Sequence, residues 1–91
     1  MLVQRWFALT RGMLPALAAR HRWPIRFDHC FMRVCLDHAF GRPWRTVVAA
    51  PAIRNMTGAE LLAAVAVAER IAANPEILPA LNRESLRLRR Q

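Results

Sequence analysis

The segment from residue 27 to residue 44 holds most of the side chains that could do chemistry. It contains both cysteines, two of the three histidines and two of the six acidic residues. These residue types can bind a metal, act as a thiol nucleophile or form an acid–base pair. Their spacing matches none of the strong motifs for those chemistries. The segment therefore indicates where a site would lie without defining a reaction.

A metal site in this segment would have to use Asp28, Cys35 and His38. Cys35 and His38 are three residues apart, and Asp28 faces roughly the same way as Cys35 on a helix. Structural zinc sites draw four ligands from closely spaced pairs, and the segment supplies no second pair. A buried thiol at Cys35 and a hydrogen-bonded core histidine at His38 are the simpler interpretation. We predict no bound metal and no cofactor, with these three residues as the alternative ligand set.

Cysteine catalysis is not favoured by the sequence. A nucleophilic thiol needs a neighbouring base and a lowered pKa, yet on a helix His29 and Cys30 point about 100° apart. The same geometry keeps Cys30 and Cys35 from forming a disulfide. We therefore expect two free thiols, which fit a reducing cytoplasm. The sequence favours a protein that is not an enzyme but leaves catalysis open.

These residues fall on one expected helix, from Asp28 to Phe40. The Asp28 carboxylate can cap its first N–H groups, and Gly41 can supply the left-handed exit. Most of its surface is a wide apolar arc, formed by Cys30, Phe31, Met32, Val34, Cys35, Leu36 and Ala39. Such a pattern is typical of the central helix of a bundle.

A polar stripe on the same helix consists of His29, Arg33 and Asp37, each four residues from the next. One interpretation is a solvated face on which Arg33 and Asp37 form an ion pair. The other is a polar ridge that lines a binding cleft. The candidate cleft residues are His29, Arg33, Asp37, Trp44 and Arg54.

Helix signals recur along the rest of the chain. Gly12 is expected to end the first helix, and Thr57 with Glu60 forms a capping box that starts another. A Pro79-interrupted connector is expected at 76–81. The further helices are predicted at residues 2–11, 15–22, 57–74 and 82–89. The sequence thus predicts an all-α fold, a compact single-domain bundle of four to five short helices spanning residues 1–91.

Charge and size limit the partners. All 14 basic residues are arginine, against 6 acids, giving a net charge of +8. Arginine-mediated nucleic-acid binding is one alternative function, although no helix-turn-helix pattern is present. No apolar run approaches the roughly 20 residues of a membrane span, so no membrane partner is expected.

Aromatic residues outside the central helix suggest association. A 91-residue chain has little core volume, and it carries five such residues, Trp6, Phe7, Trp23, Phe27 and Trp44. We expect the N-terminal helix, with Trp6, to form a two-fold homodimer or to meet a protein partner. The favoured function is a small binding or protein-interaction module.

Several short stretches carry a resemblance to a known family, namely Asp28-His-Cys-Phe, Arg33-Val-Cys-Leu-Asp-His, Gly41-Arg-Pro-Trp, Pro51-Ala-Ile-Arg-Asn-Met-Thr and Leu81-Asn-Arg-Glu-Ser-Leu-Arg. The chain resembles a small bacterial family whose members are often labelled GNAT-type acetyltransferases. The resemblance implies acetyl-CoA bound on a mixed sheet through a glycine-rich loop. The glycines here, Gly12, Gly41 and Gly58, are isolated, so no catalytic residue can be carried over. An acetyltransferase-related activity is the other alternative function.

Overall fold

Helix α3 (Asp28–Phe40) is the centre of the fold in the computed structural model, which describes residues 1–90. It packs against α5 (Gly58–Ala73) and α6 (Leu78–Leu88). Gly41 leaves the helix at φ 70°, in the left-handed region that glycine tolerates. The predicted bounds and the glycine exit are confirmed. The prediction that the Asp28 carboxylate caps the helix is wrong: Phe27 holds the N-cap position, and Asp28 accepts the N–H of the next residue, His29.

The first helix continues where the sequence predicted a break. α1 (Leu2–Phe7), a π-helical segment (Ala8–Met13) and α2 (Leu14–His21) follow one another without a loop. The prediction that Gly12 ends the helix is wrong. The π-helical turn shifts the backbone pairing by one residue, so that the Leu14 N–H bonds the Leu9 carbonyl. Pro15 has no N–H to donate, but it follows directly after the residue at which the pairing pattern changes. The helix therefore continues through it.

The second half of the chain begins with the predicted capping box. The Thr57 hydroxyl accepts the Glu60 N–H at 3.1 Å, and the Glu60 carboxylate accepts the Thr57 N–H at 2.8 Å. The predicted connector at 76–81 is wrong, because α6 already begins at Leu78 after a 3-10 turn (Pro75–Ile77). Pro79 lies in the first turn of α6, where a missing N–H costs nothing. Another 3-10 turn (Trp44–Thr46) and the short α4 (Ala52–Asn55) complete the described elements.

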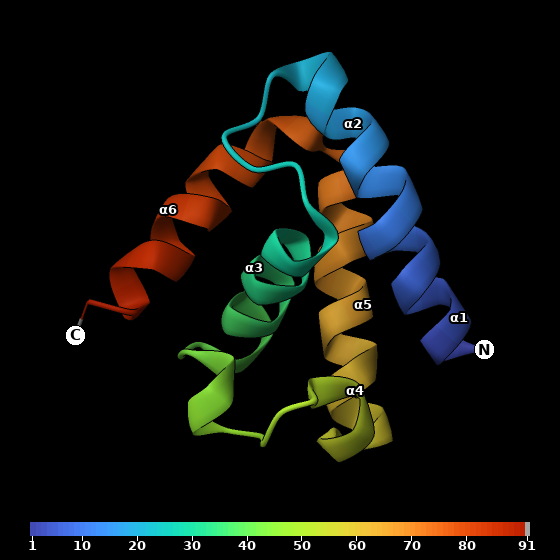
Figure 1. Cartoon of the computed structure of the whole chain (residues 1–91), viewed down its shortest axis with the longest axis vertical. Coiled ribbons are helices and arrows are strands. Elements are labelled where there is room, and N and C mark those ends of the chain that lie inside the picture. Colours follow the sequence, from blue (N-terminus) through green and yellow to red (C-terminus); the bar gives the residue numbers. More distant parts are fainter. Residues whose placement is uncertain (91) are drawn as a thin grey trace.

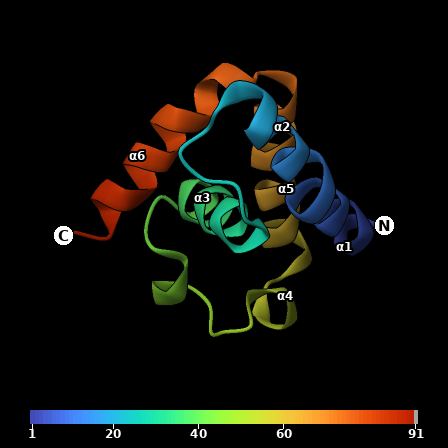
Figure 2. The ribbon, with the colours of Figure 1, turned by 45° about the horizontal axis from the view of Figure 1, so that its top comes forward.

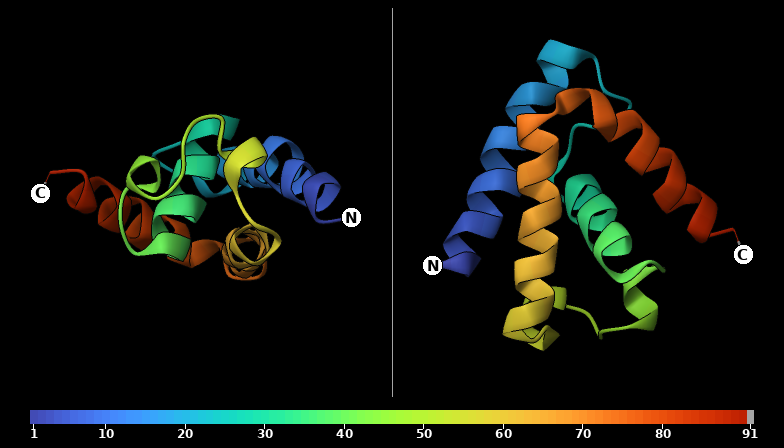
Figure 3. Two further views of the ribbon diagram at one scale, coloured as in Figure 1. Left: turned by 90° about the horizontal axis from the view of Figure 1, so that it is seen from below. Right: turned by 180° about the vertical axis from the view of Figure 1, so that it is seen from behind.

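The helices form two arms with α3 between them (Figure 1). One arm pairs the continuous α1–α2 helix with α5, and α6 is the other arm (Figures 1 and 2). Seen from behind, α5 runs between the α1–α2 helix and α3 and packs beside α3 (Figure 3). The radius of gyration is 12.1 Å, close to the roughly 12 Å expected for a compact domain of this length. Within residues 1–90 there is no strand, and the all-α, single-domain prediction is confirmed.

Trp6 does not lie on the outer surface of the N-terminal helix. Its side chain is 2% exposed, and Trp23 is 9% exposed, so both belong to the core of a single chain. The proposed role of Trp6 in a dimer contact is therefore wrong, because α1 uses that face to pack on α5. A dimer through another surface stays a prediction.

Candidate functional site

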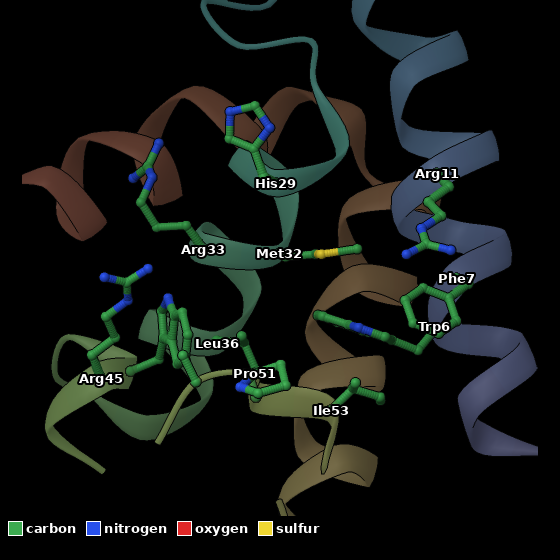
Figure 4. Close-up of a pocket in the computed structure, with 13 residues that line it drawn as sticks. Trp6, Phe7, Arg11, His29, Met32, Arg33, Leu36, Arg45, Pro51 and Ile53 are labelled. Atoms are coloured by element: carbon green, nitrogen blue, oxygen red, sulfur yellow. The ribbon is translucent and has the colours of Figure 1, made fainter. Parts of the chain in front are cut away.

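A pocket of about 350 Å³ opens between the N-terminal helix, α3 and the segment that leads to α4 (Figure 4). That volume lies within the range of small-molecule sites. The lining residues are Trp6, Phe7, Arg11, His29, Met32, Arg33, Leu36, Trp44, Arg45, Ala50, Pro51, Ala52 and Ile53.

One face of α3 supplies the back of the pocket. His29, Met32, Arg33 and Leu36 stand at positions i, i+3, i+4 and i+7, which project to the same side of a helix. Figure 4 shows Met32 and Leu36 on α3 facing the space that Trp6 closes from the N-terminal helix. The interior is therefore apolar, with a buried tryptophan as one of its walls.

The mouth of the pocket is positively charged. The Arg11 guanidinium lies 3.8 Å from the centroid of the Phe7 ring, and the Arg45 guanidinium lies 5.2 Å from the Trp44 ring. Both arginines are exposed, as is His29. Among the lining residues there is no acid. Asp28 supplies a negative charge close to the mouth. Its carboxylate is 3.8 Å from Arg11 Nε and 3.6 Å from His29 Nδ1.

The structure brings together three of the five predicted cleft residues around this pocket, namely His29, Arg33 and Trp44. Arg54 is exposed and does not line it. Arg33 contributes its side chain to the wall, while its guanidinium donates to Asn82 Oδ1 at 2.8 Å and to Ser85 Oγ at 2.6 Å, both on α6. The guanidinium of Arg33 is therefore hydrogen-bonded to α6.

Asp37 is fully buried and does not line the pocket. It accepts hydrogen bonds from Ser85 Oγ at 2.7 Å, from Arg89 Nε at 3.0 Å and from the Trp44 N–H at 2.8 Å. The predicted ion pair between Arg33 and Asp37 is wrong, because both side chains reach α6 rather than each other. Asp37 therefore supports the pocket from behind, by fixing the turn that carries Trp44.

The alternative metal ligands are not brought together. Within residues 1–90, no three His, Cys, Asp or Glu side chains are placed to hold a metal ion. Cys35 is fully buried, whereas Asp28 lies at the surface beside Arg11. The expectation of a core histidine is also wrong, because His38 is half-buried in a depression that Glu84 also lines.

The two thiols are free and are expected to differ in reactivity. Burial raises the pKa of Cys35 to about 12, so its thiol keeps its proton, while Cys30 is only half-buried. Because the thiolate is the reactive form, a chromogenic disulfide reagent at pH ~8 should label Cys30 alone in the folded protein. Both thiols should react after denaturation. Rapid labelling of Cys35 in the folded protein would contradict its place in the core.

Comparison with known proteins adds no relative: no family model, curated protein or solved structure matches the chain. The resemblance to acetyltransferase-labelled proteins stays untested, and residues 1–90 contain no strand for the mixed sheet that it implies. No helix in this part of the chain has the length and apolarity needed to cross a bilayer. Fold and pocket together describe a small all-α protein with an apolar pocket and a basic mouth.

Proposed function

We propose that this protein is a small binding module whose pocket takes the apolar part of an anionic ligand. The observation that carries the proposal is the combination of an apolar interior with Arg11, Arg45 and His29 at the mouth. An apolar body would release water from the half-buried side chains of Met32, Trp44 and Ile53, and its anionic end would meet guanidinium groups that bind carboxylate or phosphate.

Binding is favoured over catalysis by the titratable groups available. The lining side chains that carry a proton-exchanging or charged group are His29 and three arginines, Arg11, Arg33 and Arg45. Arginine stays protonated in proteins, so His29 has no acid–base partner among the lining residues. Neither cysteine lines the pocket. This supports a site that holds its ligand without changing it.

Tryptophan fluorescence can test the proposal, because Trp6 and Trp44 both line the pocket. The probes are decanoate, decanol and decyltrimethylammonium, which share one apolar chain and differ in charge. We expect decanoate to bind about tenfold more tightly than decanol, since a charge-assisted hydrogen bond contributes about 1.5–3 kcal/mol. The cationic probe should bind most weakly. Equal affinity for all three would contradict the anionic part of the proposal.

Two matched variants locate the site. Arg45→Ser removes a charge from the mouth, whereas Arg42→Ser removes another exposed charge, from a residue that does not line the pocket. We expect Arg45→Ser to bring the affinity for decanoate towards that for decanol, and Arg42→Ser to change it less than about twofold. Equal losses in the two variants would mean that net charge, and not this pocket, attracts the probe.

A further inference from the structure

The segment that joins α2 to α3 is the second feature of the surface that combines charge with an aromatic ring. Residues 20–27 hold three arginines, Arg20, Arg22 and Arg26, and no acid. All three are exposed, and Phe27 is 55% exposed, unlike the other phenylalanines and the tryptophans of residues 1–90. Phe27 therefore presents an aromatic ring to solvent within an arginine-rich stretch.

This segment is held in place by the core beneath it. The Trp23 indole donates to the Pro75 carbonyl at 3.2 Å and meets the Phe31 ring edge-on at 5.7 Å. The segment thereby crosses over the junction of α5 and α6 (Figure 1). Arg22 adopts φ 52°, a left-handed conformation that is costly for a residue other than glycine. The exposure of Phe27 and of the arginines follows from this fixed backbone.

Phe27 and His29 form a pair of parallel rings at the surface, which we call the ledge. Their rings are nearly parallel, at 5° and a centroid distance of 5.8 Å, and the His29 side chain is 77% exposed. The Arg26 guanidinium lies 5.3 Å from the Phe27 ring centroid. Beside the ledge is a depression lined by Arg22, Trp23, Arg26 and Phe27. The acid nearest in sequence, Asp28, lies 3.8 Å from Arg11 Nε and 3.6 Å from His29 Nδ1, so two basic side chains offset its charge.

We infer that this surface binds single-stranded nucleic acid. An exposed ring stack can take an unpaired base, and arginines beside it can take the flanking phosphates, which is how single strands are bound without sequence preference. A duplex hides its base faces, so it would use only the arginines. Of the residues on this surface, His29 also lines the pocket described above, whereas Arg22, Arg26 and Phe27 do not, so variants of Arg26 and Phe27 test the inference separately from the proposed ligand.

Fluorescence anisotropy with a labelled oligo(dT) of about 12 nucleotides tests the stacking step. At about 50 mM salt, we expect the single strand to bind at least fivefold more tightly than a duplex of the same length. Phe27→Leu keeps an apolar side chain but removes the ring, and should weaken binding at least fivefold. Phe27→Trp should retain binding. Unchanged affinity in Phe27→Leu would overturn the inference.

A second pair of variants distinguishes binding at this surface from non-specific electrostatic attraction of the oligonucleotide to the basic protein. Arg26→Ser and Arg83→Ser each remove one exposed charge, the first beside the ledge and the second on α6. We expect at least a threefold loss of oligo(dT) affinity for Arg26→Ser and almost none for Arg83→Ser. Equal losses would overturn the inference. It would also fail if Phe27→Leu abolished binding to phosphatidylglycerol vesicles but left oligonucleotide binding intact, which would assign the surface to lipid.

Discussion

Phe31→Ala is expected to lower the free energy of unfolding by about 3–5 kcal/mol, the usual cost of removing a buried phenylalanine ring. Phe31 is 0% exposed, and its ring meets Trp23 edge-on. A domain of this size has a total stability of only about 5–10 kcal/mol, so most of it would be lost. Urea denaturation followed by circular dichroism measures the change.

Phe27→Ala is the matched control, because it removes the same ring from a side chain that is 55% exposed. Its cost should stay under about 1 kcal/mol, as for most surface substitutions. Similar unfolding midpoints for Phe31→Ala and the unmodified protein would mean that α3 is not the centre of the core.

The parts of this fold that could be predicted from sequence depend on local signals. The bounds of α3 follow from its apolar arc and from Gly41, and the start of α5 follows from two reciprocal hydrogen bonds within four residues. The errors at Gly12 and Pro79 have different causes. Glycine inside a helix costs only about 1 kcal/mol relative to alanine, which tertiary packing can outweigh. Proline breaks a helix in its interior but not in the first turn, where Pro79 lies.

The candidate pocket was only partly predictable for the same reason. His29 and Arg33 share a face of α3 with Met32 and Leu36, which helical spacing alone indicates. Arg11 was not predicted, because only the packing of the first helix beside α3 brings it to the mouth. Tertiary packing also places Ile53 there, from a four-residue helix with no strong signal of its own.

Asp37 shows most clearly what local spacing cannot reveal. Its side-chain partners Ser85 and Arg89 are 48 and 52 residues away in the sequence, so an i,i+4 rule points to Arg33 instead. Burial explains the difference, because a carboxylate in the core needs full hydrogen bonding, which Ser85, Arg89 and the Trp44 N–H supply. Breaking a buried pair leaves an uncompensated charge or donor, which costs more than the pair contributes when intact.

Asp37→Ala is therefore expected to lower the free energy of unfolding by about 2–4 kcal/mol, mainly because hydrogen-bond donors in the core lose their acceptor, while the Arg89 side chain, 33% exposed, still reaches water. It would leave Arg89, the Ser85 hydroxyl and the Trp44 N–H without their acceptor. Asp28→Ala, which removes a half-exposed carboxylate from the same helix, should cost under about 1 kcal/mol. Thermal and urea unfolding of the two variants, side by side, measure this difference.

The conservative change Asp37→Asn separates the role of Asp37 in the fold from its role behind the pocket. The amide oxygen can still accept the Trp44 N–H, but the charge that faces Arg89 is gone. We expect a smaller loss of stability than for Asp37→Ala, and decanoate binding close to that of the unmodified protein, because the turn that carries Trp44 keeps its hydrogen bond. If Asp37→Asn instead lost decanoate binding while keeping its stability, the charge of Asp37 would act on the pocket directly, and its assignment as a buried support would be wrong.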